Sequence, residues 1–165
     1  MKRINERDIA LNGIIAAMYV VVTFLCSPIA YGAIQFRISE ILVLLCFFNR
    51  KLSIGLVLGC LISNCASPMA AIDVPFGTLA TLIACIGVMF SRHLIVAIFF
   101  PVFANAFIVA AELTTIGEPY WFSFLTVGAG ELAVMIVGYI VLMLLKKRKN
   151  FFEAIKANRN LDFKF

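Results

Sequence analysis

The sequence has few charged residues. Only 14% of its 165 residues are charged, whereas 63% are hydrophobic and the mean hydropathy is +1.04. Soluble domains are typically about a quarter charged, so this composition excludes a soluble globular enzyme. Lipid is expected to surround most of the surface. We therefore predict a single all-α integral membrane domain over residues 1–165.

The residue combinations that carry metal, nucleotide or nucleophilic chemistry are also missing. The single histidine, His93, has no metal-ligand partners nearby in the sequence, and no phosphate-binding glycine loop or Ser/His protease arrangement is present. The cysteines are odd in number and lack the spacing of a zinc site or disulfide framework, which favours small buried apolar side chains. The sequence indicates neither an enzyme nor an ATPase, and no cofactor bound by this chain.

Six apolar segments follow one another along the chain. They cover roughly residues 9–29, 38–48, 52–66, 76–90, 93–113 and 120–145, against the roughly 20 residues of a membrane-spanning helix. Three are long enough, and the three short ones must lean on neighbouring helices or a locally thinned bilayer. The runs are continuous rather than alternating, which excludes a transmembrane barrel pattern. We predict six transmembrane helices, the first of which stays in the membrane.

Basic residues sort to one side of this arrangement. With the N-terminus inside, 13 of the 14 Lys and Arg residues fall on the inner side, including the basic tail over residues 146–165, and only Arg37 falls outside. Because Lys and Arg near helix ends are retained in the cytoplasm, we expect both termini to be cytoplasmic and the helix number to be even.

Acidic residues show the opposite distribution. Five of them lie outward or within the segments, namely Glu40, Asp73, Glu112, Glu118 and Glu131. The orientation rule says little about acids, so this excess calls for a functional explanation.

Glu131 is the most informative of these acids. It lies about ten residues, or roughly 15 Å, inside the last segment, where a carboxylate normally faces a partner or a wet cavity. Asn105 is predicted at a similar depth, and Glu112 follows it on the same helix face. These three residues are expected to line one cavity. Interhelical hydrogen bonds remain the alternative for Asn105 and Glu131, and a solvated interfacial acid for Glu112.

The outer connections add further candidate residues. The segment Gln35–Glu40 places Gln35, Arg37 and Glu40 at the mouth of such a cavity, although Arg37 and Glu40 alone also fit a structural salt bridge and Ser39 a helix cap.

Two more candidates precede the later helices. Asp73 begins the segment Asp73–Gly77, which we expect to turn the chain into the fourth helix, and a capping role explains it equally well. Trp121 is predicted at the outer interface, where an aromatic belt is its ordinary role.

Small residues mark one face of the first segment. Gly13 and Ala17 form a small-xxx-small pair, and Ala16 lies beside them. Close packing against another helix is predicted, either within this chain or from another subunit.

Over about residues 8 to 146, the chain resembles the QueT family, substrate-binding S-components of energy-coupling-factor (ECF) transporters for queuosine precursors. The resemblance is carried by Gln35–Glu40, by Asp73–Thr81 and by the pair Gly130-Glu131. It implies a six-helix S-component-like bundle in the cell membrane that binds its substrate at the outer side. It also implies docking through Gly13, Ala16 and Ala17 onto a transmembrane coupling subunit driven by two ATPases.

The family is associated with uptake of 7-aminomethyl-7-deazaguanine. A carboxylate accepts two N–H donors from its guanine-like edge while another neutralises its ammonium. The resulting hypothesis assigns the donors to Glu131 and to Glu112 or Asp73, ring recognition to Asn105, and stacking to aromatic residues such as Trp121. The alternative is a stand-alone proton- or cation-coupled carrier that uses Glu131.

Overall fold

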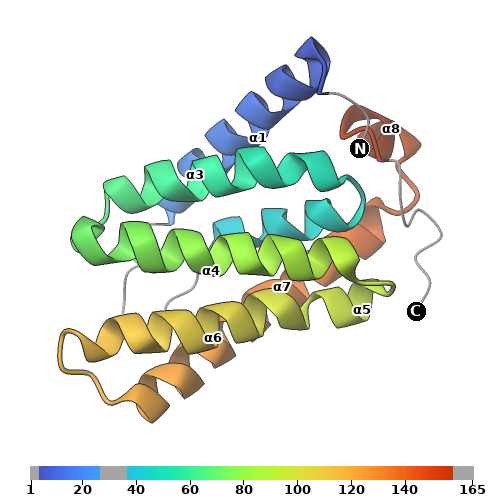
Figure 1. Cartoon of the computed structure of the whole chain (residues 1–165). Coiled ribbons are helices and arrows are strands. Elements are labelled where there is room, and N and C mark those ends of the chain that lie inside the picture. Colours follow the sequence, from blue (N-terminus) through green and yellow to red (C-terminus); the bar gives the residue numbers. More distant parts are fainter. Residues whose placement is uncertain (1–3, 27–36, 158–165) are drawn as a thin grey trace.

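All regular elements in the described part of the protein are helical. The computed structural model describes residues 4–26 and 37–157, and the elements are arranged as a bundle (Figure 1). Their bounds are α1 (Glu6–Leu25), η1 (Ile38–Phe47), η2 (Arg50–Leu52), α3 (Ser53–Cys65), α4 (Ala70–Phe90), α5 (Leu94–Ala97), α6 (Phe99–Thr114), α7 (Tyr120–Leu145) and α8 (Lys149–Ala154). The predicted all-α class is confirmed for these residues.

The helices differ in whether they are long enough to cross a bilayer. Four described spans are long and apolar enough: α1, α4, α7, and the 21 residues that α5 and α6 cover together. The 10-residue η1 and the 13-residue α3 are shorter. At about 2.0 and 1.5 Å of rise per residue, each is about 20 Å long, less than the roughly 30 Å hydrocarbon core. The number of six spans therefore stays a prediction.

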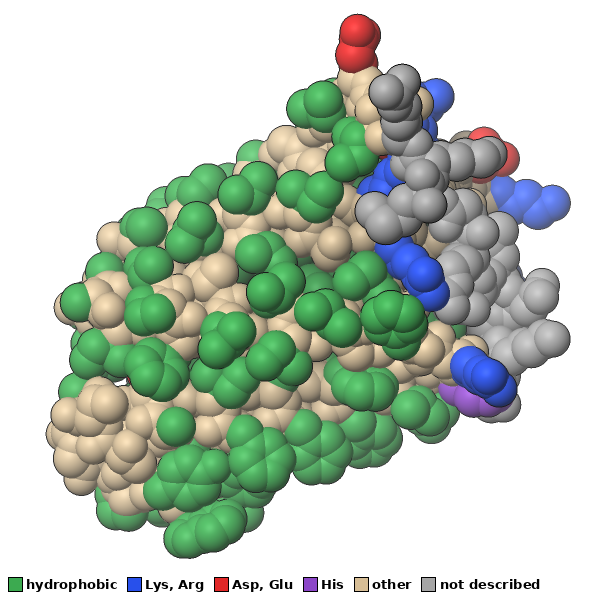
Figure 2. Space-filling view, in the orientation of Figure 1, with side chains coloured by type: hydrophobic (Ala, Val, Ile, Leu, Met, Phe, Trp, Pro, Cys, Tyr) green, Lys and Arg blue, Asp and Glu red, His purple; other side chains and the backbone are tan. Residues whose placement is uncertain are grey.

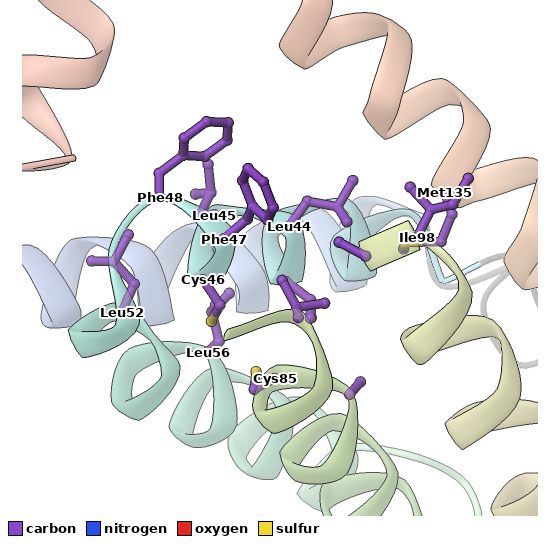
Figure 3. Packing of buried hydrophobic residues seen from close by; sticks show 14 of the residues in the cluster. Leu44, Leu45, Cys46, Phe47, Phe48, Leu52, Leu56, Cys85, Ile98 and Met135 are labelled. Carbon is purple, nitrogen blue, oxygen red and sulfur yellow. The ribbon is translucent and has the colours of Figure 1, made fainter. Parts of the chain in front are cut away.

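The short helix η1 occupies the middle of the bundle, where α1, α4 and α7 all pack against it. Figure 3 shows its apolar residues facing side chains of α3, α4 and α7. A 3-10 helix has three residues per turn, so Glu40, Val43 and Cys46 stack along one side, and none of the three is exposed. This buried column brings a carboxylate into the interior.

Glycines bring α1 and α3 into close contact. A Cβ at Gly55 would lie 2.4 Å from the carbonyl oxygen of Asn12, and one at Gly59 would lie 2.9 Å from that of Ala16. The Asn12 side chain adds a polar tie, since its Oδ1 accepts a 2.6 Å hydrogen bond from the Gly55 amide. We call this contact the α1–α3 seam. It shows that α1 has a close packing partner within this chain.

Two helix bounds differ from the predicted ones. Helix α4 begins at Ala70, six residues before the predicted start, and the expected turn at Asp73–Gly77 is helical. The helix continues through Pro75, which has no N–H to donate to the carbonyl of Ala71. The predicted fifth helix is interrupted at Ile98 between α5 and α6. Pro101 has no N–H to donate to the carbonyl of Ala97, which favours a break at this point.

The two ends of the described chain meet at one end of the bundle. Asp8 of α1 pairs with Lys51 at 2.5 Å and with Lys156, which follows α8. We call these three residues the basic-end cluster. Lys and Arg side chains gather at this end of the face in Figure 2, whereas hydrophobic side chains cover the rest of that face. That this end faces the cytoplasm stays a prediction.

The first part of the C-terminal tail packs onto the same end. Phe152 of α8 is buried against Phe48, with ring centroids 5.1 Å apart, and Asn49 donates a 2.9 Å hydrogen bond to the carbonyl of Ile155. The tail up to residue 157 is therefore tied to the helical body.

Candidate functional site

Arg37 lies at the centre of a group of buried polar side chains. It directly precedes η1, and it is the only Lys or Arg buried among the described residues. Its charge interacts with the carboxyl groups of Glu40, Glu112 and Glu131. The lack of a side chain at Gly77 makes room for the guanidinium, since a Cβ there would lie 2.9 Å from Nη1. Arg37 is thus a buried cation surrounded by acids from three different helices.

Glu40 has one oxygen bound by protein donors and one left open. Its Oε1 accepts hydrogen bonds from the hydroxyls of Tyr19, on α1, and Thr81, on α4, the latter at 2.9 Å. Its Oε2 is buried and has no hydrogen-bond partner in residues 4–26 and 37–157. Arg37 and Glu40 form no ion pair within the described part of the chain, so the predicted salt bridge is not observed.

Asp73 and Glu112 bring two carboxyl groups together from α4 and α6. Ser67 donates a hydrogen bond to Asp73 Oδ2, and the buried Asp73 Oδ1 has no hydrogen bond of ordinary geometry among the described residues. The same holds for both oxygens of Glu112, although its carboxyl group lies close to that of Asp73. Asp73 does not cap α4, because the cap residue is Met69. The helix-cap alternative for Asp73 is therefore wrong.

Asn105 and Glu131 face each other across the contact between α6 and α7. Together with Arg37, Val109 and Val127, they line a narrow, partly open space between the helices. No part of this space is wide enough for a water molecule. A bound molecule of any size therefore requires these side chains to move apart.

The polar atoms of this site have far fewer partners than buried groups usually have. Nine buried side-chain atoms lack a hydrogen bond among the described residues, and all belong to what we call the buried polar cluster: Arg37, Glu40, Asp73, Asn105, Glu112 and Glu131. Six of the nine atoms are oxygens. Each unpartnered buried polar group costs about 1–3 kcal/mol, and more where the group is charged. Such atoms call for an explanation, and one explanation is another molecule that supplies the missing hydrogen bonds.

Two predicted site residues are not part of this group. Gln35 lies outside the described residues. Trp121 is 71% exposed on α7 and packs edge-on against Tyr120, with centroids 5.2 Å apart. The structure therefore does not bring Trp121 to the buried polar cluster, and its position fits the aromatic belt that is its ordinary role.

Three hydroxyl residues of the site were not singled out from the sequence: Tyr19, Ser67 and Thr81. The sequence does contain a pattern that indicates Thr81. It follows Asp73 and Gly77 at intervals of four residues, so all three share one face of a helix. Tyr19 and Ser67 carry no such signal, since their partners are far away in the sequence or in a turn.

A groove lies between α1 and α3, beside the α1–α3 seam. It has a volume of about 260 Å³, and its lining includes Gly13 and Ala16 of α1 and Leu58 of α3. A Cβ at Gly13 would meet nothing within 4 Å, so this side of α1 is open. Ala17 is exposed beyond the groove. Two of the three predicted docking residues, Gly13 and Ala16, therefore line the same groove.

Comparison with known proteins gives consistent results. A sequence model of the QueT transporter family matches residues 9–147. The queuosine precursor transporter QueT of Lactococcus lactis subsp. cremoris (strain MG1363) is 36% identical over 167 aligned residues, which cover 90% of this chain and 97% of that protein. No solved structure is significantly similar to the chain. With its long apolar helices, the chain is a multi-pass membrane protein. These matches show that the chain belongs to the QueT transporter family.

Proposed function

We propose that this protein is the substrate-binding membrane subunit of an ECF-type ABC importer in the cell membrane. Its substrate is a queuosine precursor, 7-aminomethyl-7-deazaguanine, which binds in the buried polar cluster. The family and the named relative support a queuosine precursor as the substrate. The observation that carries the choice of site is the set of nine buried polar atoms without partners, most of them acceptors.

The proposed substrate matches this excess of acceptors. Its ammonium and the N–H groups of its guanine-like edge are donors, and carboxylates of Glu131 and of Glu112 or Asp73 accept them. The ring carbonyl is an acceptor, for which the unpartnered nitrogens of Arg37 and Asn105 are the available donors. The ammonium group also offsets the desolvation that disfavours the charged form of these buried carboxyl groups. The role of Gln35 in closing the mouth remains part of this proposal.

The substrate enters by displacing side chains. Because the space beside Asn105 and Glu131 is too narrow for water, the described conformation is a closed one. The unpartnered atoms regain hydrogen bonds only when the base is bound, which offsets the cost of opening.

Transport in this proposal depends on partner subunits. A transmembrane coupling subunit docks on the α1 face formed by Gly13, Ala16 and Ala17, and two ATPase subunits supply the energy. The open groove beside Gly13 supports this assignment, since a helix from another chain can approach closely where side chains are small.

Isothermal titration with 7-aminomethyl-7-deazaguanine tests the binding site. Glu131→Gln and Asp73→Asn keep the side-chain shape but remove the charge, and each is expected to weaken binding about 10- to 100-fold. Glu118→Gln is the matched control, because this acid is exposed in the outer connection before α7. Wild-type affinity in both site variants would show that the base binds elsewhere.

A liposome experiment separates this proposal from a stand-alone carrier, which the buried unpartnered Glu131 also favours. Reconstituted alone, the protein is expected to bind the base but not to accumulate it under an imposed proton or sodium gradient. Accumulation without ATP and partner subunits would establish the carrier. In the complete complex, Gly13→Leu is expected to abolish ATP-driven uptake while leaving binding unchanged.

A further inference from the structure

Tyr19 joins the buried polar cluster to the α1–α3 seam. Its side chain is 1% exposed, and its hydroxyl donates to Glu40 Oε1 inside the bundle. Its Cβ lies on the seam, because a Cβ at Gly59 would come within 2.8 Å of it. One side chain therefore contacts both the carboxylate of η1 and the close approach of two helices.

The seam in turn forms the inner wall of the groove. Ala16 lines the groove, and its backbone lies against Gly59 of α3 in the same contact as Tyr19. A shift or tilt of α1 relative to Gly59 therefore changes the distance between α1 and α3, the two helices that line the groove.

We propose that Tyr19 is a positioning residue that links substrate occupancy of the buried polar cluster to the shape of the α1 docking face. This inference rests on the proposed function and deepens it. When a substrate N–H donor binds the open Oε2 of Glu40, the carboxylate shares its charge with a new partner. The hydrogen bond that Glu40 Oε1 accepts from the Tyr19 hydroxyl then weakens. Tyr19 is a rigid ring on two rotatable bonds, so a shift of its hydroxyl is passed to α1.

Thr81 provides a control built into the structure. Its hydroxyl donates to the same Oε1 atom as Tyr19, but from α4, which does not contribute to the seam. Loss of either hydroxyl removes one hydrogen bond from Glu40, and only loss of the Tyr19 hydroxyl breaks the connection to α1. The variants Tyr19→Phe and Thr81→Val therefore each remove one donor to Glu40 Oε1, and only Tyr19→Phe removes a donor that α1 carries. Thr81→Val also removes the 3.2 Å contact between the Thr81 hydroxyl and Cys60 Sγ of α3, so a shift that persists in this variant excludes that contact as the link.

Linkage makes the connection work in both directions. If substrate binding alters the docking face, occupation of that face by a partner alters substrate affinity by the same factor. The Tyr19 hydroxyl is the proposed carrier of this coupling. A second tie between α1 and η1, the 2.8 Å hydrogen bond between Thr23 and Ser39, lies one turn further along and holds that end of α1 in place.

The experiment measures the position of α1 in the full-length protein in nanodiscs. Spin labels are placed at Ala17→Cys on α1 and Leu79→Cys on α4, two exposed positions, after Cys26 and Cys65 are replaced by serine. Double electron–electron resonance then gives the distance between the labels with and without 7-aminomethyl-7-deazaguanine. Titration calorimetry gives the affinity of each variant.

The expected results distinguish the two variants. Each weakens binding by about 2- to 10-fold, the effect of one hydrogen bond. The ligand-dependent shift in label distance persists in Thr81→Val and is lost in Tyr19→Phe. Binding with the same shift in both variants, or binding to the wild type with no shift, would overturn the inference. Absence of binding to the wild type would instead overturn the proposed function, and the inference with it.

Discussion

The protein contains two clusters of charged side chains that differ in whether their polar atoms are satisfied. In the basic-end cluster, Asp8 uses both oxygens to pair with Lys51 and Lys156, and its backbone N–H donates to the side chain of Asn5, the N-cap residue of α1. In the buried polar cluster, one arginine faces several acids, and nine atoms have no partner among the described residues. The charged groups of the basic-end cluster find their partners within the protein, whereas the unpartnered atoms of the buried polar cluster need another molecule to bind.

This difference indicates which feature marks a ligand site in an apolar protein. Charge alone does not mark it, because both clusters are charged and contain a buried acid. The unpartnered atoms mark it, because leaving buried polar atoms without hydrogen bonds is costly and is therefore rare in folded proteins. The basic-end cluster is expected to affect stability, and the buried polar cluster to affect binding. Four experiments test this separation.

The largest effect is expected from Arg37→Met, which removes the only cation of the buried polar cluster. Breaking a buried charge arrangement by removing one partner costs about 3–5 kcal/mol. We expect this loss in thermal unfolding in detergent micelles, and a larger loss at about pH 8 than at about pH 5, because protonation of the surrounding carboxylates relieves their repulsion. Arg50→Met is the control, since Arg50 is exposed over the ring of Phe90. An equal, pH-independent loss in both variants would contradict a central role of Arg37.

The basic-end cluster is broken by Asp8→Asn, which removes the charge that holds Lys51 and Lys156. We expect a lower melting temperature and unchanged affinity for 7-aminomethyl-7-deazaguanine, because the tie between α1, η2 and the tail is lost while the site stays intact. Thermal unfolding and calorimetry of the same preparation measure both. Glu6→Gln, an exposed acid in the same helical turn, serves as the control. A loss of affinity as large as that of Glu131→Gln would show that the two clusters are not separate.

Salt is expected to have a smaller effect that sharpens the same contrast. Raising the ionic strength from about 0.1 M to about 1 M shortens the screening length from about 10 Å to about 3 Å. The side chains of Lys51 and Lys156 are 21% and 25% exposed, so their pairs with Asp8 weaken slightly. The wild type should lose a little stability and Asp8→Asn should not. An equal response in both proteins would assign the salt effect to other residues.

The smallest effect is expected from Trp121→Phe. Because the indole is exposed near the start of α7, its replacement should change substrate affinity by no more than about twofold, the scale of an ordinary surface substitution. Calorimetry against the wild type measures this. A loss of more than about tenfold would place the indole in the site after all.

The sequence was informative about the candidate site because polar residues are conspicuous in apolar segments. Asn105, Glu112 and Glu131 stood out for this reason, and the structure brings them together with Arg37 and Glu40. Tyr19 did not stand out, because a tyrosine in an apolar helix is ordinary and its partner lies 21 residues away. Trp121 was included on its type alone, and type does not decide which way a side chain on α7 points.

The helix bounds show the same limit. Apolar runs predicted where the helices lie, but they did not predict that Asp73 is part of α4, because Pro75 inside the helix is a residue that ordinarily ends or kinks one. The close approach of α1 and α3 depended on Gly55 and Gly59, which matter only because α1 lies against them.

The sequence by itself determined that this chain is helical and surrounded by lipid, since so apolar a chain has to satisfy its backbone polar groups internally. It also determined that the few remaining polar residues are distributed unevenly. Only the tertiary structure decided which acids surround Arg37 and which atoms remain without partners. The physical reason is that these side chains come from η1, α4, α6 and α7, whose packing against one another sets every distance between them.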